Sequence, residues 1–178
     1  PLAGLRSSQG LRVMVVDEGD VYDEFNYGIV HPEAIHDFLD YAYHHWEPPR
    51  TAYVLLVGDG TYDPRNFMDT GTPTFIPPYL RCVDPILCET AADNRYVTVE
   101  GEDILPDLHL GRLPVNSAAE AQAMVQKLLT YDQSLPPGDW LHRILFVTDN
   151  ADSAGNFPAL SDEVADHLLP ASYQAQKI

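Results

Sequence analysis

The chain has 178 residues, about the length of one domain at roughly 150 residues per domain. It carries 10 lysine and arginine residues against 27 aspartate and glutamate residues, so its formal net charge is −17. This charge argues against a protein that binds nucleic acid or an anionic membrane, because phosphate groups are bound by basic surfaces. The apolar share of 45% is enough for a buried core, and no apolar run reaches the roughly 18 residues that predict a membrane span.

The first part of the chain alternates between predicted strands and helices. Residues 11–16 (LRVMVV) are apolar and β-branched, which predicts a buried strand ending at Asp17. Apolar residues at helical spacing predict an amphipathic helix over residues 32–46, which begins at a proline and ends before a proline pair. Residues 52–57 (AYVLLV) predict a second buried strand, followed by the glycine-rich turn 58–60.

The middle of the chain has a weaker pattern. Residues 61–92 are rich in proline and show no clear period, so they are interpreted as a long surface excursion. Residues 95–99 predict a short strand of a hairpin in this excursion. Residues 107–110 (DLHL) predict the third strand of the main sheet, ending before Gly111.

The last part resumes the alternation of helix and strand. Ser117 and Glu120 have the spacing of a capping box and predict the start of a helix that continues to about Tyr131. Residues 143–148 (RILFVT) predict a fourth strand, and the apolar spacing over 160–169 predicts a last helix.

Buried apolar strands separated by helices predict an α/β fold with a mainly parallel sheet covered on both faces. This sheet is expected to contain segments of all four strands: residues 13–16, 54–57, 108–110 and 144–147. The sequence at 136–138 (PPG) marks an internal boundary. Residues 177–178 indicate the beginning of a further strand, from which we infer a fragment or one half of a processed protein.

Three of the predicted strands end in an aspartate: Asp17, Asp59 and Asp149. Parallel strands share their carboxyl ends, so these carboxylates are expected along one edge of the sheet, where α/β sheets bind ligands. Together they could bind a metal ion or a cationic substrate. Taken singly, each aspartate is more simply a cap of the turn or helix that follows it.

The loop 149–156 (DNADSAGN) is rich in oxygen ligands, but it does not have the spacing of an EF-hand. A calcium site that includes Asp149 and Asp152 is one interpretation, and a solvated loop is the other.

Cys82 and Cys88 lie in one proline-bearing loop. The sequence is equally consistent with a disulfide, formed in an oxidising compartment, and with two free thiols.

Several enzyme classes are unsupported. No phosphate-binding G-x-x-x-x-G-K-[ST] loop and no G-x-S-x-G nucleophile turn occurs. A phospho-receiver domain needs a lysine near a later strand end, but Lys127 lies in a predicted helix and Lys177 at the terminus. His109, inside a predicted strand, is interpreted as a histidine of the core or the sheet face.

Four strings form a specific combination in this order: VYDEFNYG at 21–28, LLVGDGTYDP at 55–64, ADNRY at 92–96 and GRLPV at 111–115. They resemble the gingipain-type cysteine peptidases, peptidase family C25, over about residues 11–152. The resemblance implies a caspase-like three-layer α/β/α fold. It also implies a secreted or cell-surface protein that cleaves protein or peptide substrates with a Cys–His dyad.

In the family the dyad histidine precedes a glycine and the cysteine follows at a later strand end. None of the seven histidines here precedes a glycine, and both cysteines lie before the fourth strand. The dyad is therefore expected beyond Ile178, with no catalytic residue in this chain. The resemblance makes residues 1–138 the first subdomain of the peptidase and residues 139–178 the truncated start of the second.

The resemblance also points to supporting residues after the fourth strand. Asp149 and Asn150 match the region that supplies the family's catalytic support and part of its substrate pocket, and Asp162 lies near the place of a pocket acid. The expected partner is the C-terminal part of the same peptidase; no cofactor is required, and a structural calcium ion is optional. The alternative is a non-catalytic scaffold or a calcium-binding module of a larger secreted or surface protein.

Overall fold

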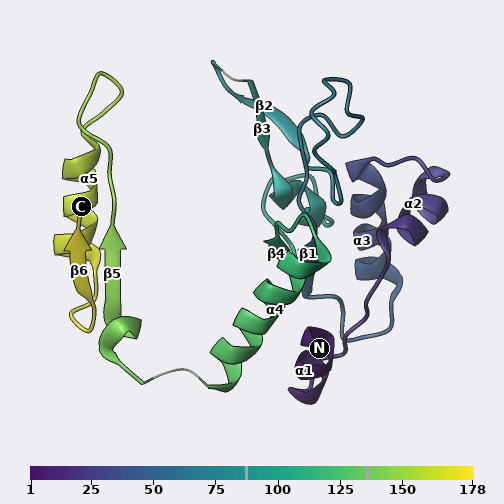
Figure 1. Ribbon diagram of the computed structural model, residues 1–178, viewed down its shortest axis with the longest axis horizontal. Helices are drawn as coiled ribbons and strands as arrows, with labels where there is room; N and C mark the ends of the chain where they lie inside the picture. Colours follow the sequence, from purple (N-terminus) through teal and green to yellow (C-terminus); the bar gives the residue numbers. More distant parts are fainter. Residues whose placement is uncertain (87, 135–136) are drawn as a thin grey trace. The chain divides into compact units, whose positions relative to one another are not determined.

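The chain combines helices with short strands in the computed structural model, which describes residues 1–86, 88–134 and 137–178 (Figure 1). The helices are α1 (Leu2–Ser8), α2 (Glu18–Asn26), α3 (Pro32–His45), α4 (Ala118–Gln133) and α5 (Phe157–Glu163). The strands are β1 (Tyr53–Val57), β2 (Leu80–Asp84), β3 (Cys88–Ala91), β4 (His109–Leu113), β5 (Arg143–Phe146) and β6 (Gln174–Lys177). Short 3-10 helices η1 (Asp93–Val97) and η2 (Asp139–His142) and a π-helical turn η3 (Val164–Leu168) complete the order.

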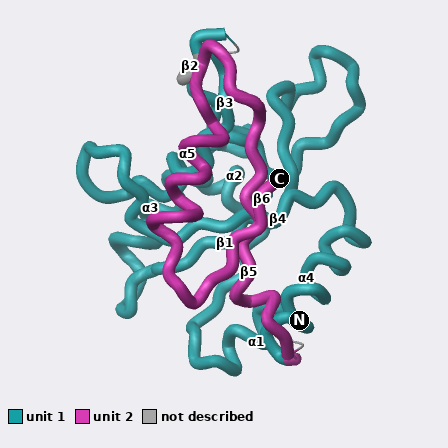
Figure 2. The backbone as a smooth tube through the Cα atoms, turned by 90° about the vertical axis from the view of Figure 1, so that its left-hand side faces the viewer, with its two compact units in different colours: residues 1–133 teal, residues 134–178 magenta. Residues whose placement is uncertain are grey.

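The chain forms two compact units, coloured separately in Figure 2: Pro1–Gln133 and Ser134–Ile178. Each unit has one parallel strand pair. In the first unit β1 pairs with β4, from Tyr53 opposite His109 to Val57 opposite Leu113. In the second unit β5 pairs with β6, and α5 and η3 form the crossover between them. The parallel pairs, together with the α-helices of both units, confirm the predicted α/β class.

The core of the first unit lies where α2, α3 and η1 meet β1 and β4. Its buried apolar residues are Val21, Tyr22, Ala34, Ile35, Leu39, Leu56, Ile76, Tyr96, Val97, Val99 and Leu108. Helix α3 confirms the prediction over 32–46, because Pro32 occupies its first turn and its buried residues share one face. The Nδ1 atom of His31 accepts a hydrogen bond from the Glu33 N–H at 3.2 Å and caps the helix.

Most other predicted elements are confirmed, with shifted ends. The strand predicted over 52–57 is β1, that over 143–148 is β5, and the helix predicted over 118–131 is α4. The Ser117 Oγ accepts the Glu120 N–H at 3.2 Å, as a capping box requires. The predicted last helix corresponds to α5 with η3, and the strand expected from residues 177–178 is β6.

The prediction of a buried strand over residues 11–16 is wrong. This segment is not a strand, and its apolar side chains are exposed, with Val15 at 81%. The Arg12 guanidinium fixes its start by donating to the carbonyls of Glu47 and Pro49 at 2.5 and 2.9 Å. A β-branched apolar run becomes a strand only where a neighbour offers its backbone, and the segment has no strand partner within the part of the chain that the structure describes.

Two further predictions need correction. Residues 95–99 do not form a strand; residues 93–97 form η1 instead, because one tight turn brings both Tyr96 and Val97 into the core with no exposed surface. The single sheet of four strands is also not observed. The described residues form three sheets of two strands each: β1 with β4, β5 with β6, and the antiparallel hairpin of β2 with β3. The predicted boundary at 136–138 includes residue 136, which lies outside the described residues.

Candidate functional site

Three of the four family strings meet at the carboxyl end of β1, where the side chain of Arg112 joins them. Its Nε and Nη2 atoms donate to the two carboxylate oxygens of Asp93 at 2.6 and 2.9 Å. Its Nη1 atom donates to the carbonyl oxygens of Gly58 and Ile76 at 2.9 and 3.0 Å. A planar guanidinium suits this task, because its donors form a rigid fork that fits a carboxylate with two parallel bonds.

The Arg112–Asp93 pair is largely withdrawn from water. The Arg112 side chain is 15% exposed and that of Asp93 is 31% exposed. Burial alone lowers the pKa of Arg112, but the hydrogen bonds to Asp93 and the charge of that carboxylate outweigh burial and raise the pKa. The arginine therefore stays charged, and its charge is compensated within the protein.

The glycines after β1 let a second segment approach the strand end closely. A Cβ atom on Gly58, which has φ +148°, would lie 2.6 Å from the Cβ of Phe75. A Cβ atom on Gly60 would lie 2.4 Å from the carbonyl oxygen of Ile76. The backbone oxygen of Asp59 accepts the N–H groups of Phe75 and Ile76, which fixes this approach. The G-D-G sequence thus serves close packing rather than phosphate binding.

The carboxylates of Asp59 and Asp17 serve local structure. Asp59 accepts the Gly60 N–H at 2.9 Å through Oδ1 and the Asn116 amide at 3.0 Å through Oδ2. Asp17 accepts the Gly19 N–H at 2.9 Å and is the N-cap of α2. Asp17 does not follow a strand, so the expectation of three carboxylates along one sheet edge is wrong for this residue. Asp59 and Asp149 belong to different units, and their juxtaposition stays a prediction.

Two buried tyrosines flank this region. The Tyr96 hydroxyl donates to the carbonyl of Pro77. The Tyr22 hydroxyl is also buried but has no hydrogen-bond partner among the described residues. Burial and, to a lesser degree, the nearby charge of Glu18 raise the pKa of Tyr22 to about 12. Both phenols thus remain neutral at physiological pH.

In the second unit, Asp149 lies at a shallow apolar hollow beyond the end of β5. The hollow is lined by Val147, Thr148, Asp149, Phe157 and Leu160. The Asp149 carboxylate is exposed and accepts the N–H of the adjacent Asn150 at 2.7 Å. This places a carboxylate beside an apolar surface, an arrangement that can position a peptide side chain.

The other predicted residues of this unit are engaged locally. Asp162 and Asp166 each bind the Lys177 ammonium at 2.8 Å. The hydrogen bond to Asp162, followed by that to Asp166, raises the pKa of Lys177. Asp162 therefore ties α5 to β6 and does not line the hollow at Asp149. Asp152 accepts the N–H groups of Ala154 and Gly155 within its own loop.

The two cysteines are joined to each other. Cys82 and Cys88 form a disulfide across the hairpin of β2 and β3, with their Cα atoms 4.1 Å apart. This resolves the open choice between a disulfide and two thiols. Because the chain contains two cysteines, it has no free thiol in this state.

Two arrangements were not predicted from the sequence. One is the Arg112–Asp93 pair, for which the sequence gives no local signal. The other is a group formed by Glu33, His36 and Asp37, whose potential ligand atoms lie within 4.8 Å of one another. Within the described ranges, this is the one group of three such side chains; Asp149 and Asp152 do not belong to another. The separation of these residues by three and four positions within a predicted helix is the sequence pattern that could have revealed this group.

Comparisons with known proteins identify a family and a fold. The family model of peptidase family C25 matches residues 1–178. The crystal structure of dimeric latent PorU from Porphyromonas gingivalis is similar, with a TM-score of 0.58 and 22% sequence identity. The similarity covers 79% of this chain and 15% of that chain, and it supports the caspase-like fold. No curated protein matches this chain. No helix among the described residues is long and apolar enough to span a membrane.

The Arg112 contacts predict a large loss of stability for Arg112→Ala. The variant leaves a half-buried carboxylate and two carbonyls unpaired, so we expect the free energy of unfolding to fall by about 3 kcal/mol. Arg50→Ala is the control, because the Arg50–Glu100 pair is 58% exposed on both sides and should contribute less than about 1 kcal/mol. Urea denaturation measures both; equal losses would contradict a special role for Arg112.

The unpartnered Tyr22 hydroxyl predicts that Tyr22→Phe is tolerated, with a change in stability within about 1 kcal/mol at pH 7. The pKa of Tyr22 is raised from 10.0 to about 12 in the folded chain. Its neutral form therefore stabilises the fold below pH 10, and this contribution is lost as the pH rises from 10 to 12. Urea denaturation across this pH range should show a smaller loss for Tyr22→Phe than for the parent chain. Tyr27→Phe, at a ring 96% exposed, should behave like the parent; identical curves for all three proteins would refute the assignment.

Proposed function

Since the chain belongs to peptidase family C25, we propose that it is the N-terminal portion of the catalytic domain of a secreted cysteine endopeptidase, and that it is inactive alone. The chain spans about 15% of the length of the PorU chain that it resembles. The proposal assigns peptide-bond hydrolysis to the assembled peptidase. It assigns to these residues the first part of the scaffold and one border of the substrate groove.

The observation that carries this proposal is the Cys82–Cys88 disulfide. A cysteine peptidase attacks the scissile carbonyl with a thiolate, and an imidazole moves the proton. Both cysteines of this chain have their sulfur atoms bonded to each other, and neither lies at the end of a parallel strand. The nucleophile and its histidine are therefore assigned to the C-terminal part of the same peptidase, beyond Ile178.

The disulfide also supports the proposed location. Disulfides persist in oxidising environments, outside the cytosol of most organisms. The bond closes a short loop at the end of a hairpin, where it holds β2 against β3. This agrees with a secreted or cell-surface protein whose substrates are proteins or peptides.

Asp149 and Asn150 are proposed to border the substrate groove of the assembled peptidase. Both follow β5, and the hollow beside Asp149 presents Val147, Phe157 and Leu160. Asp162 is a weaker candidate for a pocket acid, because its carboxylate already binds Lys177.

A second candidate function is a non-catalytic scaffold or a calcium-binding module of a larger secreted or surface protein. The exposed oxygen ligands of Asp149 and Asp152 favour calcium. However, both carboxylates also accept backbone N–H groups of their own loop, so any ion would need further ligands from carbonyls or water.

The first prediction is that purified residues 1–178 do not hydrolyse peptide reporters, including those with Arg or Lys before the scissile bond. Assays with and without mild reductant cover both states of the cysteines. The double variant Cys82→Ala/Cys88→Ala is the control. Turnover that this double variant abolishes would place the nucleophile in the hairpin and overturn the proposal.

A second prediction concerns the full-length protein. Asp149→Ala should lower kcat/KM at least tenfold, about 1.4 kcal/mol of transition-state stabilisation, with little change in melting temperature, because the side chain is exposed. Asp152→Ala is the matched control from the same loop and should retain activity. Equal activity in all three proteins would remove the 149–156 loop from the substrate groove.

The calcium alternative has its own test. If the loop holds calcium, the melting temperature of residues 1–178 rises with added CaCl2, because an ion that binds only the folded state stabilises it. Asp149→Ala and Asp152→Ala should each remove this increase, whereas Asp139→Ala, elsewhere in the same unit, should not. A melting temperature that is independent of calcium rules the site out.

A further inference from the structure

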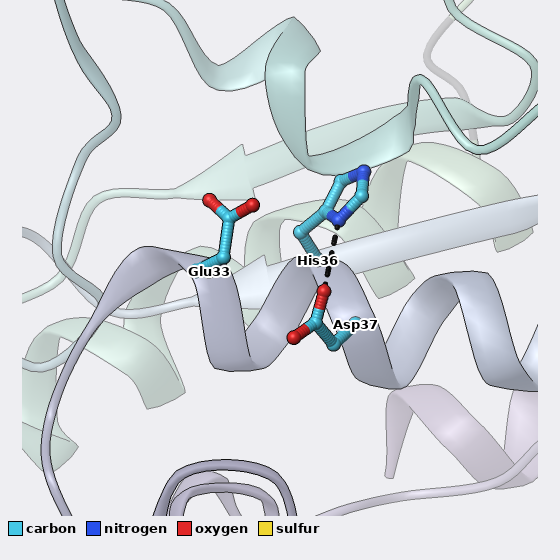
Figure 3. A group of neighbouring side chains, drawn as sticks. All are labelled: Glu33, His36 and Asp37. Atoms are coloured by element: carbon cyan, nitrogen blue, oxygen red, sulfur yellow. Dashed lines mark hydrogen bonds and ion pairs between the residues drawn. The ribbon is translucent and has the colours of Figure 1, made fainter.

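Glu33, His36 and Asp37 lie together on the first half of α3 (Figure 3). Residues separated by three and four positions share one face of a helix, so the spacing itself brings these side chains together. Each offers one ligand atom, and all three atoms lie within 4.8 Å of one another. From this geometry and the contacts described below, we propose that the three residues bind a divalent transition-metal ion, with Zn²⁺ as the preferred ion.

The orientation of the His36 ring supports this assignment. Its Nε2 atom is 3.1 Å from the carbonyl oxygen of Thr98. A carbonyl can only accept a hydrogen bond, so Nε2 carries the proton and the neutral ring has its lone pair on Nδ1. Metal-binding histidines are commonly held in this way, with the second ring nitrogen donating to a carbonyl or carboxylate.

The lone pair of His36 faces another acceptor. Nδ1 lies 3.4 Å from Oδ1 of Asp37, so in the neutral ring a cation placed between the two atoms could bind both. Ligands placed about 2.1 Å from one tetrahedral zinc ion are about 3.4 Å apart, which matches this pair. Glu33 lies within 4.8 Å of both and completes a set of three with a small rotation of its exposed side chain.

Glu33 is also held from outside the group. The Tyr79 hydroxyl donates to Glu33 Oε2 at 2.7 Å. Thr98 and Tyr79 therefore hold two of the three ligands from separate segments of the chain, as the outer contacts of metal sites do.

The donor set favours zinc over calcium. Imidazole nitrogen suits zinc and other transition metals, whereas calcium takes six to eight oxygen ligands. The His36 side chain is 23% exposed and that of Asp37 is 52% exposed, so an ion can enter from solvent and keep a water ligand. A bound ion would strengthen the connection of α3 to Tyr79 and Thr98; this role is independent of the proposed peptidase function.

The same helix contains a matched pair without a third ligand. His44 Nδ1 lies 3.3 Å from Asp40 Oδ1, with comparable exposure. It also lies 3.0 Å from the Asp40 carbonyl oxygen, which can only accept, so in this pair the proton is on Nδ1. The described residues give this pair no third histidine, cysteine or carboxylate within the same distance. The proposal therefore predicts metal binding at His36 and none at His44.

The test is calorimetric titration of ZnCl2 into residues 1–178 that have been freed of metal by a chelator. We expect one Zn²⁺ per chain. His36→Gln should weaken binding at least tenfold, although its amide can still donate to Thr98. His44→Gln should leave the affinity unchanged. Tyr79→Phe, which removes only the hydrogen bond to Glu33, should weaken binding about tenfold.

Circular dichroism without metal establishes that each variant is folded; a variant that does not fold is replaced by Glu33→Gln, for which the same loss of affinity is expected. Absence of zinc binding up to millimolar concentration would overturn the proposal. Equal effects of His36→Gln and His44→Gln would also overturn it. Displacement of zinc by an equimolar amount of CaCl2 would refute the assignment of the ion.

Discussion

The paired hydrogen bonds between Arg112 and Asp93 are the interaction on which the first unit depends. The guanidinium binds one carboxylate and two backbone carbonyls, and the four acceptors come from three separate segments. Gly58 lies just beyond β1, and Ile76 lies in the segment packed against it. Buried carbonyls and carboxylates without donors are strongly destabilising. One side chain thus allows β1, η1 and the segment around Ile76 to be buried together.

This dependence explains what the family strings encode. Gly58 and Gly60 permit close packing, Asp93 and Arg112 form the ion pair, and Tyr22 belongs to the core. These residues stabilise the fold. None of their described contacts places them next to a group with which they could react. A resemblance carried by such strings therefore predicts the architecture well, whereas it leaves the chemistry to residues outside the strings.

The same reasoning explains which features could be predicted from the sequence. The spacing of apolar residues predicted α3 and α4, because amphipathic helices are specified locally. It failed for residues 11–16, since strand formation depends on a partner that the segment does not contain. The Arg112–Asp93 contact spans 19 positions, and no local pattern indicates it. The Glu33, His36 and Asp37 spacing was visible, but the state of His36 depends on Thr98, 62 positions away.

Exposed apolar surface links this architecture to the proposed larger peptidase. Residues of β1 that alternate with its core residues remain in solvent: Tyr53, Leu55 and Val57 are each at least 45% exposed. The segment 11–16 adds more apolar side chains in the same unit. Burial of apolar surface is favourable by about 25 cal/mol per Å². A contiguous apolar patch on a protein surface usually marks an interaction site. The face of β1 that carries Tyr53, Leu55 and Val57 is therefore a surface on which further apolar side chains could be buried, whether they come from the same protein or from a partner.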